Sequence, residues 1–290
     1  MDYTLLVAVE SPARSNGLDT YLTELCRHTD TRLVLMHVTP DLSDIDPAQA
    51  ADIVTAARAM LRDYAGRLAL PDERIAFRIG MGDAATEIVK ATIIEQAGIV
   101  ALATRTHSGL ERLVEGSVAE SVMRRAHCPA LICRADHAPA VHGSGRAIEK
   151  ILVPLDGSDQ SARIIDTVAE LAHLTGARII LYHDDQGYLE LETPETALDV
   201  GSQLDEYQQR LTAEGLEVEV EMSQLGKPAE EILHKTEELG VDLVAMTTHG
   251  RRGVSRLLFG SVAESVLYHG GCPLLVLSTS PTRRLEQTER

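Results

Sequence analysis

Glycine and serine residues whose spacing suits phosphate binding gather between residues 247 and 264. Gly260 and Ser261 are expected to open a helix, and Ser261 with Glu264 fits the S-x-x-E pattern of a capping box. A helix N-terminus offers unpaired amide donors and partial positive charge, which stabilise an anion. Gly250 and Gly260 have no Cβ atom, so backbone amides can approach phosphate oxygens closely. The pattern predicts a phosphate-binding loop.

Positive charge is concentrated in the same stretch. Arg251, Arg252 and Arg256 lie there, in a chain whose formal net charge is −17. The loop differs from a P-loop, because the G-x-x-x-x-G-K-[ST] spacing does not occur in the sequence. The alternative interpretation is a tight turn without a ligand, in which Ser261 serves only as a helix cap. Capping and phosphate binding by this serine are compatible.

Asp156 follows the apolar run Ile151–Leu155 and offers a second contact for a ligand. Its carboxylate can accept a hydrogen bond from the amino group of adenine, and a hydrogen bond to a charged group is stronger than a neutral one. The alternative is that Asp156 only caps the next helix through the Asp-Gly-Ser turn.

The elements that must position these residues occur twice. The segment 116–122 recurs letter for letter as 260–266, and residues 82–134 align without a gap with 226–278. Of those 53 aligned pairs, 21 are identical. Two similar halves indicate duplication of one module. We expect domain 1 at 1–135, a linker at 136–148, domain 2 at 149–280 and a tail at 281–290.

Each half alternates short apolar runs with helical patterns, which predicts an α/β fold. Strands are predicted at 5–9, 33–38, 74–79, 98–103, 130–133, 150–155, 178–182, 217–221, 241–246 and 274–277, and helices of the second half near 159–174, 196–214, 228–238 and 262–269. Continuously apolar runs are typical of parallel strands covered on both faces. The sequence therefore predicts two tandem, doubly wound, five-stranded parallel-sheet domains of Rossmann-like type. Ligands of such sheets bind outside the carboxyl ends of the strands, where the strand order reverses.

The chain resembles the universal stress protein family over nearly its whole length. The residues Gly250-x₉-Gly260-Ser261 match the last two elements of that family's G-x₂-G-x₉-G-[ST] signature. Ile151-Leu-Val-Pro-Leu-Asp156-Gly-Ser and Gly226-Lys-Pro also resemble family motifs. Thr247 stands where the signature has its first glycine, so its side chain either crowds the ribose or bonds to it. The resemblance implies a fold like the adenine nucleotide alpha-hydrolases.

An adenine nucleotide, ATP or AMP with or without Mg²⁺, is the ligand that the resemblance implies. In the family the carboxylate matching Asp156 contacts the base, and the glycine loop holds the ribose and phosphates. The nucleotide-binding residues implied for this chain are Pro154, Asp156, Thr247, Gly250, Arg251, Gly260, Ser261 and Val262. No structural metal is expected.

The first half has lost most of this pattern. Thr106 stands where the second half has Gly250, and Glu10 stands in place of Asp156. A β-branched residue forced into a left-handed conformation costs roughly 1–2 kcal/mol, and its Cβ atom blocks a phosphate. Glu115 lies next to Gly116, where its charge would repel a phosphate. We expect the first half to bind adenine nucleotide weakly or not at all.

Composition narrows the protein class. Apolar residues make up 44% and charged residues 24%, as in ordinary globular proteins. The absence of a long apolar run argues against a membrane span, and the acidic net charge disfavours binding to nucleic acid or to an anionic membrane. The four cysteines lack metal-ligand spacing and are expected to be mostly buried thiols. His37 and His183 are expected to be packed or hydrogen-bonded. A cytoplasmic location follows as an expectation.

The favoured function is a stress-response or signalling protein whose adenine nucleotide, bound mainly in domain 2, tunes conformation or partner binding. The alternatives are a ligand-free interaction scaffold, or a slow ATP-hydrolysing or adenylyl-transferring enzyme. No general base can be nominated from the sequence, so the chain is not classified as an enzyme. The two modules are expected to form an intramolecular pseudo-dimer through the strands at 130–133 and 274–277, since the family commonly dimerises along that edge. A homodimer of whole chains is also possible.

Overall fold

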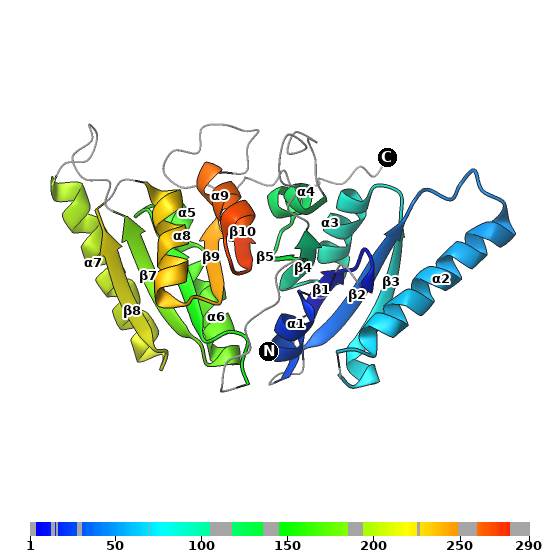
Figure 1. The fold of residues 1–290 in the computed structure, drawn as a ribbon, viewed down its shortest axis with the longest axis horizontal. Coiled ribbons are helices and arrows are strands. Elements are labelled where there is room, and N and C mark those ends of the chain that lie inside the picture. The colour runs from blue at the N-terminus through cyan, green and yellow to red at the C-terminus, as the bar shows by residue number, and fades with distance from the viewer. Residues whose placement is uncertain are drawn as a thin grey trace, which may run out of the picture.

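The computed structural model describes residues 4–12, 15, 17–27, 31–68, 70–104, 118–135, 145–184, 194–224, 227–248 and 260–278, with the backbone alone at 194–199. Strands and helices alternate in both halves (Figure 1). The elements of the first half are β1 (Thr4–Ala8), α1 (Asp19–Arg27), β2 (Arg32–Thr39), α2 (Pro47–Ala65), the 3-10 turn η2 (Asp72–Arg74), β3 (Ile75–Met81), α3 (Ala84–Ile94), β4 (Ile99–Thr104), α4 (Val118–Arg125) and β5 (Ala130–Arg134). Those of the second half are β6 (Lys150–Pro154), α5 (Asp159–Ala162), α6 (Ile165–Thr175), β7 (Arg178–Asp184), α7 (Pro194–Ala213), β8 (Val218–Ser223), α8 (Pro228–Leu239), β9 (Leu243–Thr247), α9 (Ser261–His269) and β10 (Leu274–Leu277).

All the strands described join one ten-stranded sheet in the order β3-β2-β1-β4-β5-β10-β9-β6-β7-β8. Within each half the pairs are parallel, and the strand order is the same. The halves meet where β5 and β10 pair antiparallel, with Leu275 opposite Leu131. The strand order reverses beside the first strand of each half, between β1 and β4 and between β6 and β9.

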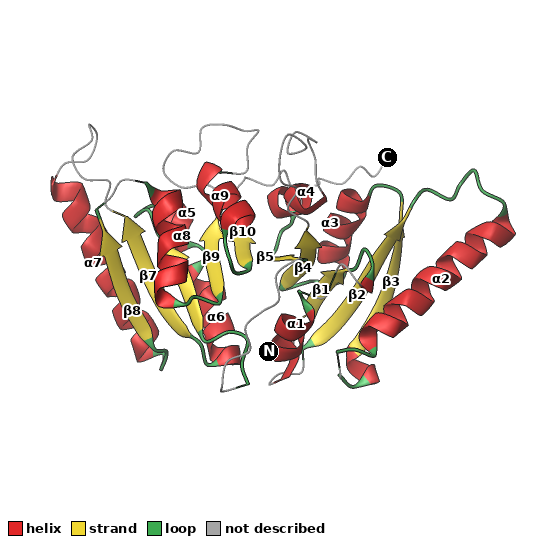
Figure 2. Ribbon diagram, viewed as in Figure 1, coloured by secondary structure: helices red, strands yellow, loops and turns green. Residues whose placement is uncertain are grey.

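Helices cover both faces of the sheet (Figure 2). Residues of α1, α2, α6 and α7 pack with one set of strand side chains, and residues of α3, α4, α8 and α9 pack with the alternate set. Both clusters contain residues from the two halves. This arrangement confirms the predicted doubly wound α/β fold, because parallel strands need apolar cover on both faces.

The predicted strands lie within about two residues of the observed ones. The single helix predicted near 159–174 is wrong in one respect, since the structure has two helices, α5 and α6, there. Ser158 caps the start of α5, which ends after one turn with Arg163 as its C-cap residue. Ile164 is the N-cap residue of α6. The apolar spacing of residues 164–172 does not reveal the break, because it keeps a helical period.

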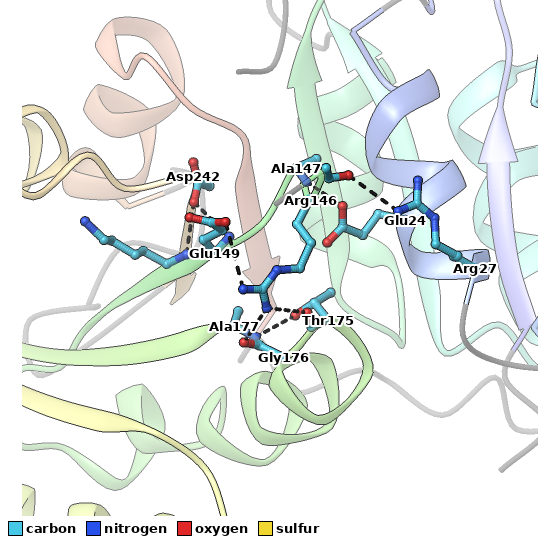
Figure 3. Close-up of polar contacts among 11 residues, drawn as sticks. Glu24, Arg27, Arg146, Ala147, Glu149, Thr175, Gly176, Ala177 and Asp242 are labelled. Atoms are coloured by element: carbon cyan, nitrogen blue, oxygen red, sulfur yellow. Dashed lines mark hydrogen bonds and ion pairs between the residues drawn. The ribbon is translucent and has the colours of Figure 1, made fainter. Parts of the chain in front are cut away.

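The segment that enters the second half is attached to both halves (Figure 3). The backbone amide of Ala147 donates to the carboxylate of Glu24 on α1. The guanidinium of Arg146 donates to the carbonyl of Gly176, at the end of α6, at 2.9 Å. Asp242, just before β9, accepts hydrogen bonds of 2.9 Å from the amides of residues 149 and 150. The start of β6 is therefore fixed by α1, α6 and the N-terminal end of β9.

In the part of the chain that the structure describes, every helix is too short or too polar to span a bilayer.

Candidate functional site

The hydrogen-bonded ladder between strands β6 and β9 is short. Their pairing stops at Leu152, whereas the equivalent pairing of β1 with β4 continues to Ala8. Open α/β sheets bind ligands at this reversal of strand order. The second half therefore has fewer paired residues than the first at the position where a ligand is expected.

Pro154 gives a physical reason for the shorter ladder. The carbonyl of Lys150 accepts from β9 at 3.0 Å, and the amide of Leu155 donates to β7 at 2.8 Å. Even-numbered residues of β6 therefore face β9, and the backbone nitrogen of Pro154 does so without an N–H group. Ala8 stands at the same position of the first half and keeps its donor.

Asp156 organises the turn that follows β6. Its Oδ1 atom accepts from the amide of Ser158 at 3.0 Å and from the hydroxyl of Ser158 at 2.6 Å. Ser158, rather than Asp156, caps α5, because its hydroxyl accepts from the amide of Ser161 at 3.1 Å. Gly157 has a φ angle of 75°, which favours glycine. A carboxylate has about four acceptor sites, so holding this turn leaves acceptor capacity for a further donor.

The N-terminus of α9 packs against the end of β9. Thr247 and Thr248 are buried there, and the amide of Thr248 donates to the carbonyl of Leu277 at 3.1 Å. A Cβ atom on Gly260 would collide with the carbonyl oxygen of Thr248. Glycine at 260 is thus required by the contact between helix and strand. This contact brings the start of α9 to the carboxyl end of β9.

The predicted capping box at Ser261 is wrong. Gly260 occupies the N-cap position, and Ser261 is the first helical residue with an exposed side chain. The amide of Glu264 donates to the carbonyl of Gly260 at 2.9 Å, as in an ordinary helical turn. The hydroxyl of Ser261 is therefore on the surface near the helix start. Val262 is partly buried and packs on the core beneath.

Two of the predicted site residues, Gly250 and Arg251, lie outside the described residues. The same holds for the other arginines of the loop and for the first-half residues from Thr106 to Ser117. The structure therefore brings together the ends of β6 and β9 and the start of α9, with Pro154, Asp156, Thr247, Gly260, Ser261 and Val262 on them.

Both predicted histidines are hydrogen-bonded, as expected. The Nδ1 atom of His183 lies 2.8 Å from the carbonyl oxygen of Leu155, and that of His37 lies 2.8 Å from the carbonyl oxygen of Val9. A carbonyl only accepts, so each Nδ1 carries the proton. His183 thereby fixes the residue that precedes Asp156.

A recess beside the Asp156 turn is lined by Gly157 and Ser158 of that turn and by residues of α5 and α7, among them Tyr207. A water-sized sphere finds practically no room inside this recess. Ligand pockets for small molecules usually measure about 300–1,000 Å³. We therefore do not assign the nucleotide to this recess.

Among the described residues, no three His, Cys, Asp or Glu side chains come together as metal ligands. Three of the four cysteines are buried free thiols, and Cys272 is partly exposed.

The family model described as "Universal stress protein family" matches residues 3–134 and again residues 147–278. The chain belongs to the universal stress protein family.

Several universal stress proteins are similar to this chain in sequence. One from Methanocaldococcus jannaschii is 32% identical over 140 residues, covering 44% of this chain and 81% of that protein. One from Mycobacterium tuberculosis is 27% identical over 208 residues, covering 65% of this chain. The match spans 64% of the length of the mycobacterial protein.

A solved structure of a universal stress protein from Archaeoglobus fulgidus has a similar fold. Its TM-score is 0.72 at 21% identity, and the match covers 95% of this chain and 96% of that one. This likeness concerns the fold alone.

Sequence reasoning missed two features of the region. The contact of Thr248 with Gly260 could have been expected from the position of a glycine at a helix start. The hydrogen-bonded side chains of Tyr182, Ser223 and Asp184 required the register of β7 and β8, which the sequence does not give.

Proposed function

We propose that this universal stress protein binds an adenine nucleotide, ATP or AMP, in its second domain. The phosphates lie at the start of α9, near Gly260 and Ser261, and Gly250 and Arg251 complete the loop. The base lies over the ends of β6 and β9, where Asp156 accepts from its amino group. Pro154, Thr247 and Val262 line the same region.

One observation carries this proposal: the ladder between β6 and β9 ends at Leu152, and the start of α9 lies at the end of β9. A phosphate near the first amides of α9 is stabilised by unpaired donors and by the helix dipole. Asp156 follows β6, the strand next to β9, so its carboxylate belongs to the same edge of the sheet. A nucleotide places its negative and its donor-bearing ends apart, which suits this separation of amides and carboxylate.

The first domain binds nucleotide weakly or not at all in this account. Its β1 and β4 stay paired to Ala8, whereas the second half has lost its ladder at the equivalent position. Glu10 stands in place of Asp156, and Thr106 in place of Gly250. The proposed boundaries are 1–135 and 149–280 for the domains, with the linker at 136–148.

The two domains work as an intramolecular pseudo-dimer in this proposal. Besides the β5–β10 pair, Arg134 donates to the carbonyl of Tyr268 at 3.4 Å, and Ser278 donates to the carbonyl of Arg124 at 3.0 Å. Arg134 corresponds to Ser278 and Arg124 to Tyr268 at the repeat offset of 144, so the two contacts are related by the duplication. The hydroxyl of Tyr268 also donates to Glu120 at 2.8 Å. Nucleotide bound at α9 can therefore affect the contact between the two domains, because Tyr268 belongs to that helix. Homodimer formation and a cytoplasmic location stay predictions.

Isothermal titration calorimetry of the full chain with AMP and ATP tests the proposal. We expect one site per chain. Asp156→Asn should weaken binding about 10-fold or more, since it removes a hydrogen bond to a charged group. Glu10→Gln, the matched change in the first domain, should leave affinity unchanged. Two equivalent sites, or equal losses in both variants, would contradict the assignment. Product analysis after long incubation with Mg-ATP separates binding from hydrolysis or adenylyl transfer.

A further inference from the structure

A buried carboxylate joins the first domain to the linker. Glu24 on α1 is 4% exposed, and its Oε2 atom accepts a hydrogen bond from the backbone amide of Ala147 (Figure 3). Arg27, in the last turn of α1, donates to the carbonyl of Gly145 at 3.4 Å. We call these two hydrogen bonds the α1–linker contact. Through them, a helix of the first domain holds the residues that lead into β6.

The repeat shows that burial of this carboxylate is particular to the first domain. Glu24 corresponds to Glu170 on α6 at an offset of 146 residues, because β1 starts at residue 4 and β6 at residue 150. Leu25 corresponds to Leu171 in the same way, and both leucines are buried. Glu170, in contrast, is exposed. The same position is therefore open to water in the second domain and bonded to the linker in the first.

Opposing forces act on the α1–linker contact. An ionised carboxylate has about four acceptor sites, and Oε1 of Glu24 has no hydrogen-bond partner among the described residues. Burying a charged group costs free energy unless the group is fully hydrogen-bonded. Opening would return the carboxylate to water, but it would also expose Ala147 and Ile148, which are 1% and 0% exposed. The contact can therefore open or close, and anything that binds one of the two states better shifts this equilibrium.

The contact is attached to the strand that leads to Asp156. Strand β6 starts three residues after Ala147, and the amides of residues 149 and 150 bond to Asp242, which precedes β9. The β6 residues 151–153 are fully buried and paired with β7. A close-packed strand moves as a unit, because its neighbours leave no free space. A displacement of the linker therefore reaches the two strands that border the proposed site, and reaches Asp156 through one of them.

We propose that Glu24 is a positioning residue for the nucleotide site of the second domain, acting through Ala147 and β6 on Asp156. This inference rests on the proposed function and concerns the regulation of that site. The closed contact fixes the start of β6, and the open contact releases it. Coupling between two sites is reciprocal, so a contact that strengthens nucleotide binding is itself strengthened by nucleotide to the same extent. The first domain thereby regulates the affinity of the second.

Isothermal titration calorimetry with AMP on full-chain variants tests this inference. Glu24→Ala removes the acceptor and should weaken AMP binding about 5-fold or more. Glu24→Gln keeps an acceptor oxygen for the amide of Ala147 and should stay within about 2-fold of the unmodified chain. Glu170→Ala is the matched control and should leave the affinity unchanged, because it removes the same carboxylate from the exposed position.

Hydrogen exchange of the unmodified chain gives a measurement that a merely structural role of Glu24 would not change. The amide of Ala147 should exchange about 5-fold or more slowly at saturating AMP than without AMP, because contact and binding are linked. A structural role alone would give the same exchange rate with and without AMP. This measurement decides the question if Glu24→Ala does not fold.

Equal AMP affinity in the unmodified chain and in Glu24→Ala would overturn the inference alone, and so would exchange at Ala147 that does not respond to AMP. Losses in Glu24→Gln or in Glu170→Ala as large as that in Glu24→Ala would also overturn it, because neither pattern depends on the hydrogen bond to the linker. Absence of adenine nucleotide binding by the unmodified chain would overturn the proposed function, and this inference with it.

Discussion

Gly260 has two separate reasons to be glycine. The proposed loop needs close approach of amides to phosphate, and the fold needs contact between the start of α9 and the carbonyl of Thr248. The second reason applies with or without a ligand. The sequence suggested the glycine but placed the helix start one residue late, because the contact that fixes it lies in the tertiary structure. Loss of binding in a variant at Gly260 would therefore not by itself locate the phosphate.

Gly260→Ala should destabilise the second domain by about 1–3 kcal/mol, because the new methyl group meets backbone atoms that cannot turn away. Gly271→Ala is the matched control, since a Cβ atom there has no neighbour within 4 Å among the described residues. Urea unfolding of both variants measures the difference. Equal stability of the two variants would show that α9 does not rest on Thr248.

The buried thiols predict how stability depends on pH. Burial raises the pKa of Cys26 to about 11 and that of Cys128 to about 12, and for Cys26 the nearby Arg74 acts in the opposite direction. A thiol of the unfolded chain titrates near 9.0. Above that pH the unfolded chain loses protons that the folded chain keeps, so the unfolding free energy falls as pH rises towards 11–12.

The fall should be at most about 1.4 kcal/mol per pH unit for each thiol. Urea unfolding at pH 8, 9 and 10 measures it. The double variant Cys26→Ala and Cys128→Ala should show a shallower pH dependence, since two of the titrating groups are gone. A double variant with the same dependence as the unmodified chain would contradict this explanation.

At the scale of elements, strands were predictable and turns were not. Continuous apolar runs such as Ile151–Val153 mark the parallel strands, because both faces of the sheet are covered. The split between α5 and α6 falls at Arg163 and Ile164, within a stretch whose apolar spacing keeps a helical period. The hydrogen bonds that join Tyr182, Ser223 and Asp184 depend on the β7–β8 register. The end of the β6–β9 ladder at Leu152 depends on which way Pro154 faces. The glycine loop between β9 and α9 stays a prediction.

Pro154→Ala should lower nucleotide affinity. The amide introduced at position 154 faces β9, so it can extend the β6–β9 ladder over the region where the base is proposed to lie. Hydrogen exchange should then show a protected amide at position 154 of the variant, and slower exchange at the end of β9 than in the unmodified chain. Ala8→Pro is the reciprocal change in the first domain and should remove a donor from the β1–β4 ladder without changing affinity. Unchanged affinity in Pro154→Ala would mean that the short β6–β9 ladder does not serve the ligand.

At the scale of the whole molecule, the two halves share their cores. The cluster on the α1 and α6 side contains Leu131 of β5 and Leu275 of β10, the two strands through which the halves pair. Glu24 and Arg146 add polar contacts where the second half begins. The repeat in the sequence predicted two copies of one module. The extent of the common core could not be predicted, because it depends on the antiparallel register of β5 with β10.

Calorimetric unfolding of the full chain should show one transition. Neither half can unfold its strand of the β5–β10 pair without breaking the core that both halves share. Leu275→Ala removes a fully buried side chain at the joint and should lower that transition as a whole, by about 2–5 kcal/mol in unfolding free energy. Two well-separated transitions in the unmodified chain would indicate that the halves unfold independently.

A crystal structure of the full chain with AMP tests the central claim most directly. We expect one nucleotide per chain, with its phosphate at the first amides of α9 and its base within hydrogen-bond distance of the carboxylate of Asp156. A nucleotide bound in the first domain alone, or in the second domain away from the carboxyl ends of β6 and β9, would contradict the account.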